Sequence, residues 1–155
     1  MNLGDILSPP QIKADLRATN RWEAIDELID SLIVAGRLLP AHREPVTAAV
    51  KRRETSMSTG IGFGIGIPHA STDLVTEVTA AFGRSRAGID FDALDSQAVH
   101  LVTLLLVPHG QFQKHLHTLA AIAKVLRRDD FLKALDAAQD SESILRVIRE
   151  YSGQR

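Results

Sequence analysis

His69 is the strongest candidate for a catalytic residue, because four alternating glycines and a proline lead directly to it. The run is Gly60-Ile61-Gly62-Phe63-Gly64-Ile65-Gly66-Ile67-Pro68-His69. Glycine has no side chain to pack, so repeated glycines in an extended segment usually mark close approach of a ligand or of another backbone. Pro68 fixes its own φ and favours an extended Ile67. The pattern predicts a rigid, bare-backbone approach to a nucleophile.

The glycine run does not match the common phosphate-binding motifs. The dinucleotide-binding motif needs glycines at offsets 0, 2 and 5, and the last position here is Ile65 or Ile67, depending on the start. The Gly-Lys-Ser/Thr triplet of the Walker motif and the Gly-x-Ser-x-Gly nucleophile elbow are both absent. The remaining interpretation is a loop that lets a phosphate or a partner close on His69.

An imidazole is well suited to accept a phosphoryl group near neutral pH. With an ordinary pKa of about 6.5 it is largely neutral at pH 7, so one ring nitrogen has a free lone pair. Phosphoryl transfer then depends mainly on positioning and charge stabilisation. Arg53 is the candidate for the charge, because its planar fork suits phosphate oxygens, although it could also be a helix-end cation. Ser58 and Thr59 could donate hydroxyl hydrogen bonds.

The composition is that of an ordinary globular protein. The chain has 155 residues, 45% of them apolar, a net charge of −1 and no cysteine, so disulfides and thiolate metal sites are impossible. There is no signal pattern at the N-terminus and no apolar run long enough to cross a bilayer. We expect one domain over residues 1–155 in the cytoplasm, with no nucleic-acid partner and no membrane insertion.

Hydrophobic spacing predicts helices interleaved with strands. Residues 1–19 should be an irregular lead-in, and Asn20 should cap the first helix with Glu23 completing a capping box. The mostly apolar strand over 98–107 should be central, and 88–96 should be an edge segment and loop. Helices are expected over 20–36, 112–128, 130–138 and 141–151, and strands over 77–84 and 98–107. A further helix should have Pro45 in its first turn and end in the basic cluster 51–53. The helix over 112–128 should turn these residues inward: Phe112, Leu116, Leu119, Ala120, Ala123 and Leu126. An α/β fold with a mixed sheet flanked by helices is the simplest arrangement.

Two blocks of sequence resemble the enzyme IIA domains of the phosphoenolpyruvate-dependent phosphotransferase system, fructose/mannitol class. The first block consists of Glu54, Ile61-Gly62 and Ile65-Gly66-Ile67-Pro68-His69-Ala70, and the second of Val107-Pro108, His115-Leu116 and Leu119-Ala120-Ala121-Ile122-Ala123. The resemblance covers nearly the whole chain. This sequence departs from the family at Gly66, where alanine is usual, and at Phe63, where many members have a small or polar residue.

The resemblance implies that His69 accepts a phosphoryl group from the histidine phosphocarrier protein and passes it on. It places His115 and Arg53 beside His69, and implies a mixed sheet flanked by helices with no metal and no cofactor. Phosphate or partner contacts are expected from the segment before His69, at Ser58, Thr59, Gly60, Gly62, Phe63 and Gly64.

Two divisions stay open. A metal-dependent hydrolase is conceivable with six histidines, but His115 and His117 have the wrong spacing for one helix face. Within the resemblance, the chain is either a sugar-uptake component that passes phosphate to a IIB domain or a nitrogen-regulatory component that binds target proteins. The segments 58–62 and 119–124 favour the regulatory branch. We expect His117 at the surface, His109 in a loop that could flank the cleft, and structural roles for His42 and His100.

Overall fold

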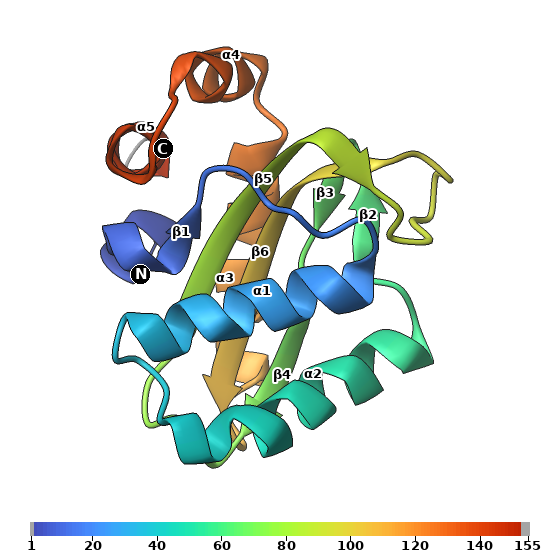
Figure 1. The fold of residues 1–155 in the computed structure, drawn as a ribbon, viewed down its shortest axis with the longest axis vertical. Helices are drawn as coiled ribbons and strands as arrows, with labels where there is room; N and C mark the ends of the chain where they lie inside the picture. Colours follow the sequence, from blue (N-terminus) through green and yellow to red (C-terminus); the bar gives the residue numbers. More distant parts are fainter. Residues whose placement is uncertain (1, 153–155) are drawn as a thin grey trace.

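The computed structural model describes residues 2–152, which form a mixed sheet with helices on both faces (Figure 1). The elements in chain order are η1 Leu3–Asp5, η2 Pro9–Gln11, β1 Ile12–Lys13, α1 Arg21–Val34, η3 Pro40–His42, α2 Arg43–Ser56, β2 Gly60–Gly62, β3 Ile65–Gly66, β4 His69–Thr72, β5 Thr79–Ile89, β6 Val99–Pro108, η4 Gln113–His115, α3 Leu116–Leu126, α4 Asp129–Ala137 and α5 Ser141–Ser152, where η is a 3₁₀-helix. The predicted α/β fold is confirmed.

Strand β6 is the centre of the six-stranded sheet, as its apolar sequence predicts. The strand order is β1-β5-β6-β3-β2, and β4 also pairs with β6. Strand β5 runs antiparallel to β6, whereas β3 and β4 follow one another along its other side in parallel. Ile65 lies opposite Leu101, and His69 lies opposite Leu105. Residues 67 and 68 therefore interrupt what would otherwise be a single strand beside β6.

Each face of the sheet has its own hydrophobic core. Helices α1 and α2 cover the face that is in front in Figure 1, and α1 contributes fully buried Ile25, Leu28 and Ile29. The N-terminal segment, α3, α4 and α5 pack on the other face, where Phe82 of β5 and Phe131 of α4 belong to one core cluster. None of the helices over residues 2–152 is both long and apolar enough to cross a membrane.

Several expected boundaries were wrong. The lead-in contains β1, a two-residue edge strand paired in parallel with β5, which is too short to give a periodic signal. Helix α2 has Pro45 in its first turn, as expected, but it continues past the basic cluster to Ser56. Strand β5 extends to Ile89 through an irregularity in its pairing with β6.

The caps and faces of the helices also differ in part from expectation. Asn20 caps α1 by accepting from the Glu23 amide, as predicted, but the Glu23 carboxylate accepts from Thr19 and so completes no capping box with Asn20. Helix α3 begins at Leu116, after a 3₁₀ turn, and its Leu119, Ala123 and Leu126 pack on the core as expected. Leu116, expected inside, is 45% exposed, and His115 is buried instead.

Candidate functional site

His69 is the first residue of β4 and lies at the interruption in the strand beside β6. The backbone is held on both sides of this point. The Ile67 amide donates to the Thr59 carbonyl at 3.1 Å, and the Leu105 amide donates to the Pro68 carbonyl at 3.0 Å. The side chain of His69 is half-buried. The backbone thus fixes its position while the ring stays accessible.

One hydrogen bond determines the tautomer of the His69 ring. Nδ1 lies 2.9 Å from the carbonyl oxygen of Ile67. A carbonyl oxygen can only accept, so Nδ1 must carry the proton, and in the neutral ring the lone pair is on Nε2. Nε2 has no hydrogen-bond partner among residues 2–152. Nε2 is therefore the ring nitrogen whose lone pair is free.

The surroundings of His69 keep the ring neutral. Burial lowers its pKa below the ordinary value of 6.5, and the Arg53 guanidinium lowers it further. The hydrogen bond to Ile67 and the Glu54 carboxylate raise the pKa, but burial is the largest effect. At pH 7 the ring is neutral and its Nε2 lone pair is available.

His69 opens into a cleft of about 450 Å³ between the C-terminal part of α2, β4 and the loop that follows β6. Arg52, Arg53 and Ser56 line it from α2, and Ser71 lines it from β4. Nη1 of Arg53 donates to the Met57 carbonyl at 2.8 Å, and no other nitrogen of its guanidinium has a partner within the described chain. The cleft therefore combines a nucleophilic imidazole with an arginine that can still bind an anion.

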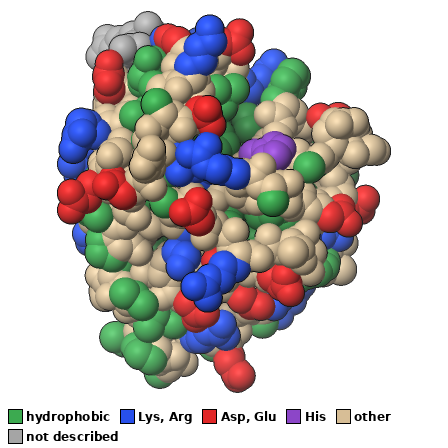
Figure 2. Space-filling view, turned by 45° about the horizontal axis from the view of Figure 1, so that its top comes forward, with side chains coloured by type: hydrophobic (Ala, Val, Ile, Leu, Met, Phe, Trp, Pro, Cys, Tyr) green, Lys and Arg blue, Asp and Glu red, His purple; other side chains and the backbone are tan. Residues whose placement is uncertain are grey.

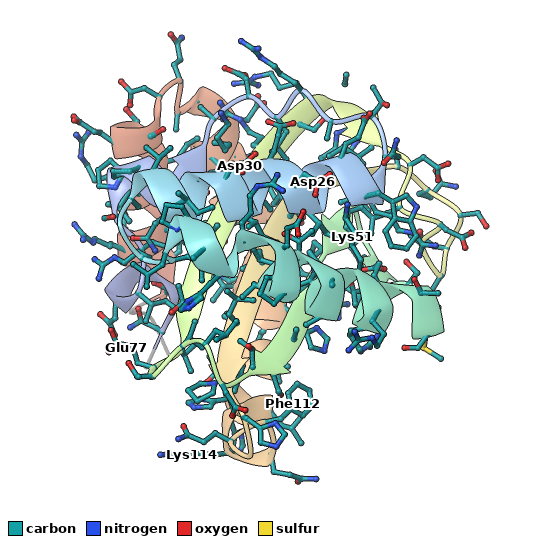
Figure 3. All side chains as sticks on the ribbon, turned by 60° about the horizontal axis from the view of Figure 1, so that its bottom comes forward. Asp26, Asp30, Lys51, Glu77, Phe112 and Lys114 are labelled. Atoms are coloured by element: carbon teal, nitrogen blue, oxygen red, sulfur yellow. The ribbon has the colours of Figure 1, made fainter. Side chains whose placement is uncertain are left out.

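The loop between β6 and α3 closes one side of the cleft. Its Phe112 ring stacks on the His69 ring, with the centroids 5.4 Å apart and 14° between the planes. Figure 3 shows Phe112 and Lys114 on this loop, beyond the end of the sheet. His115 follows in the same turn, with its amide donating to the Phe112 carbonyl at 3.0 Å, and its side chain is buried. The structure thus brings Phe112 directly to His69, and His115 to the adjoining turn.

Glu54 holds the end of α2 against the segment that leads to His69. Its side chain is fully buried and accepts hydrogen bonds from the amide of Thr59 at 2.7 Å and from the Thr59 hydroxyl. Nη1 of Arg21 lies 3.3 Å from the same carboxylate. A buried carboxylate needs such compensation, so Glu54 requires both Thr59 and Arg21 in place.

Ser58, Thr59 and Gly60 lie at the base of a hairpin and are not among the residues that line the His69 cleft. The Thr59 hydroxyl donates to Glu54, as described above, and the Ser58 hydroxyl donates to the Phe91 carbonyl at 2.6 Å. Gly60 faces Ala93 so closely that an added Cβ would lie 2.7 Å from the Ala93 Cβ. These groups are engaged within the protein itself.

Gly62, Phe63 and Gly64 form the tip of this β2–β3 hairpin. Phe63 and Gly64 have φ values of 59° and 76°, the positive values that a tight hairpin turn of type I′ requires. Ile65, which follows the tip, pairs four residues further back along β6 than His69 does, or about 13 Å at 3.3 Å per residue. The glycine run is therefore not one extended approach to His69, because it forms a hairpin whose tip lies back along β6 from the histidine.

At the hairpin end of the molecule, Arg84 and Arg86 are bonded to other groups of the chain. Figure 2 is turned toward this end and shows cationic and anionic side chains interspersed, with one histidine in a shallow hollow. Arg86 pairs with Asp136 at 2.8 Å. The buried Arg84 guanidinium donates to three backbone carbonyls, those of Ala14, Leu135 and Ala138. Both arginines are thus engaged within the chain.

The remaining histidines lie apart from the cleft lining. His117 is exposed on α3, and His109 is exposed in the loop after β6. His42 ends η3, and the ring of His100 hydrogen-bonds the Ser85 carbonyl through Nδ1 at 2.8 Å. Over residues 2–152, no group of three or more histidine, aspartate or glutamate side chains is arranged to hold a metal ion.

Comparison with known proteins identifies the family. The family model described as "Phosphoenolpyruvate-dependent sugar phosphotransferase system, EIIA 2" matches residues 5–151. The chain belongs to this EIIA family. The resemblance in the two sequence blocks is therefore confirmed, and the sheet described above is the sheet of an EIIA protein.

Relatives of this EIIA protein come from both branches of the family. The fructose-specific EIIA component of Haloferax volcanii is 40% identical over 127 residues, which cover 82% of this chain and 81% of that protein. The nitrogen regulatory protein of Bradyrhizobium diazoefficiens is 33% identical over 148 residues, covering 96% of this chain and 95% of that protein. The fructose-specific EIIABC component of Bacillus subtilis is 34% identical over 151 residues, but the chain spans only 24% of its length.

The fold of this EIIA protein agrees with a solved nitrogen-regulatory structure. The nitrogen regulatory protein IIA-Ntr of Neisseria meningitidis superposes with a TM-score of 0.82 at 28% identity, covering 94% of this chain and 98% of that one. The mixed sheet and flanking helices are therefore shared with a characterised IIA-Ntr structure.

Sequence reasoning missed one residue at the site of this EIIA protein. Phe112 was expected in the core under α3, but its ring covers His69 instead. The sequence does contain a signal for this position. Phe112 is the one apolar side chain between Pro108 and His115, and the residues around it are polar or glycine. No other apolar residue of this loop could pack with Phe112 in a core, which indicates another role for the aromatic ring.

Proposed function

We propose that this protein is a phosphocarrier that accepts a phosphoryl group on Nε2 of His69 from the histidine phosphocarrier protein. The observation that carries the proposal is the geometry of one ring. The Ile67 carbonyl holds the proton on Nδ1, while Nε2 has no partner within residues 2–152 and the ring lines an open cleft. Membership of the EIIA family supports the same chemistry.

In the proposed step, the Nε2 lone pair attacks phosphorus while the phosphorus–nitrogen bond of the donor phosphohistidine breaks. The electron pair of that bond leaves on the donor nitrogen. The product ring carries phosphorus on Nε2 and a proton on Nδ1, so the Ile67 carbonyl stabilises a ring that has become cationic. Arg53 stabilises the charge on the phosphoryl oxygens, and His115 assists from the turn beside Phe112.

Within the family we favour the nitrogen-regulatory role, in which the phosphorylation state controls binding to a target protein. Supporting it are the near-complete coverage of the Bradyrhizobium nitrogen regulatory protein and the close superposition on the Neisseria IIA-Ntr. A phosphoryl group would add nearly two negative charges beside His69 and repel a target that buries this surface without arginines. The alternative is a sugar-uptake role with transfer to a IIB domain, favoured by the 40% identity to the Haloferax fructose-specific EIIA.

The acceptor role is tested by labelling with radioactive phosphoenolpyruvate and the general carrier proteins. His69→Ala should abolish labelling, and His115→Ala should slow it but leave a phosphorylated protein. His117→Ala is the matched control, because this exposed histidine lies two residues from His115 and should label like the wild type. Undiminished labelling of His69→Ala, with folding confirmed by circular dichroism, would mean that another residue accepts the phosphoryl group.

The branch is tested by presenting the labelled protein to a purified fructose-class IIB domain. In the regulatory role the label stays on His69 over many minutes, and it leaves only in the reverse reaction with the phosphocarrier protein. Rapid movement of the label to the IIB domain would replace the regulatory assignment with the sugar-uptake one, without affecting the acceptor role.

A further inference from the structure

The stacking of Phe112 on His69 is a contact that the proposed chemistry has not used so far. The two rings are nearly parallel, at 14°, with the centroids 5.4 Å apart. Phe112 is half-buried, in a loop outside the sheet, and it lines the same cleft as His69 and Arg53. A residue in this position can restrain the imidazole ring and shield one of its faces from water.

Two independent contacts determine the orientation of the His69 ring. The hydrogen bond from Nδ1 to Ile67 specifies which edge of the ring faces the backbone, but it leaves rotation of the ring plane about that direction weakly restrained. A flat aromatic surface against one face restrains the plane itself. The direction of the Nε2 lone pair is defined only when both contacts are present.

We propose that Phe112 is a positioning residue, which holds the plane of the His69 ring so that the Nε2 lone pair points into the cleft beside Arg53. This inference rests on the proposed phosphoryl-acceptor function. Phe112 does not touch the phosphoryl group, and it acts only through the imidazole. Well-oriented reactants gain large factors in rate, and small misplacements lose them, so removal of the stack should slow the transfer step itself.

Phe112 also excludes water from one face of the imidazole. The charged groups that act on the ring are Arg53 and Glu54, both from α2, and Arg52 lines the same cleft. Burial is the largest cause of the lowered pKa of His69. Removing the Phe112 ring removes part of that burial and leaves the α2 charges in place, so the pKa should move back toward its ordinary value.

The first experiment measures phosphoryl transfer from the phosphorylated histidine phosphocarrier protein to the wild type, Phe112→Ala, Phe112→Tyr and Leu116→Ala. Phe112→Ala should lower kcat about tenfold with little change in KM, because orientation is lost while docking is not. Phe112→Tyr keeps a flat ring and should stay within about twofold of the wild type. Leu116→Ala removes an exposed apolar side chain from the next turn and should leave kcat unchanged.

The opposite kinetic patterns would overturn the inference. A raised KM with unchanged kcat would make Phe112 a partner contact. Failure of Phe112→Tyr to restore kcat would show that the flat ring is not what matters. If the wild type accepts no phosphoryl group at all, it is the proposed function that fails.

The second experiment needs no phosphoryl donor and therefore separates the two failures. Nuclear magnetic resonance titration of the unphosphorylated protein gives the pKa of His69 in each variant. We expect Phe112→Ala to raise this pKa, and Phe112→Tyr and Leu116→Ala to leave it at the wild-type value. An unchanged pKa in Phe112→Ala would show that the stack does not exist in solution and would overturn the inference.

Discussion

The buried pair of Arg21 and Glu54 allows a quantitative test of how the His69 segment is held. Glu54 has a fully buried side chain, and that of Arg21 is 16% exposed. Replacing Arg21 with methionine keeps most of the apolar stem but leaves a buried carboxylate without its cation. The two hydrogen bonds from Thr59 remain, and they cannot fully replace a positive charge in a site away from water.

The expected cost follows from the burial of the group left behind. Breaking a buried ion pair typically costs 3–5 kcal/mol, and partial exposure of Arg21 places Arg21→Met near the low end, at about 3 kcal/mol. Glu54→Gln removes the charge and keeps a group that can bond to Thr59, so about 1–2 kcal/mol is expected. The double variant has no unpaired charge, and should cost about 2 kcal/mol, less than Arg21→Met alone.

Urea denaturation of the four proteins, followed by circular dichroism, measures these free energies of unfolding. Arg43→Met is the matched control, because Arg43 pairs with Asp30 at 2.7 Å but the two side chains are 37% and 55% exposed. That surface pair should be worth less than about 1 kcal/mol. The reasoning fails if Arg21→Met costs no more than the Arg43 control, or if the double variant is less stable than Arg21→Met.

Two further predictions concern His69 and the hairpin. The folded-state pKa of His69 lies below its ordinary value of 6.5, so phosphoryl acceptance should vary little above about pH 7.5 and should begin to fall at a lower pH than it would for an ordinary imidazole. Between the two pKa values the unfolded chain binds more protons, so the wild type should lose stability relative to His69→Gln as pH falls below about 6.5, and the difference should level off below the folded pKa. No change between about pH 8 and 5 would contradict this. Gly60→Ala should lower the free energy of unfolding, measured with urea, by about 1–3 kcal/mol, because the added Cβ would overlap Ala93. A loss below about 0.5 kcal/mol would show that the hairpin shifts to make room for the methyl group.

The sequence predicts this protein well where the signal is local. Asn20 as a helix cap, the apolar β6 at the centre of the sheet and the helix that begins at Ser141 all follow from composition and spacing. The glycines show the limit of such reasoning. They indicate a close approach, but nothing local says that the approaching group at Gly60 is Ala93 of the same chain and not a ligand.

The same limit applies to the site. The tautomer of His69 depends on the Ile67 carbonyl, and the stack depends on a loop more than 40 residues further along the chain. Neither contact gives a periodic signal in the sequence. The Ile67 carbonyl lies only two residues before His69, and Phe112 belongs to a distant loop that the tertiary fold brings to the ring. Helical spacing therefore placed Phe112 on the inward face of the helix expected over 112–128, whereas the structure places it in the cleft.

The short length of β2 explains why the Ile67 carbonyl is available to His69. In a parallel strand, alternate carbonyls face alternate neighbours, so the Pro68 carbonyl faces β6 and the Ile67 carbonyl faces the side on which β2 lies. Strand β2 begins at Gly60, which pairs with Gly66, and the preceding Thr59 uses its carbonyl to accept from the Ile67 amide. No strand residue is left to bind the Ile67 carbonyl, and Nδ1 of His69 takes that place.

A continuous series of contacts thus connects the first turn of α1 to the reactive ring. Arg21 neutralises Glu54, Glu54 holds the amide and hydroxyl of Thr59, the Thr59 carbonyl holds the Ile67 amide, and the Ile67 carbonyl orients His69. Each of these contacts is shorter than 3.4 Å. In the proposed transfer Glu54 therefore need not touch the phosphoryl group, because it holds the backbone whose Ile67 carbonyl leaves the free lone pair of His69 on Nε2.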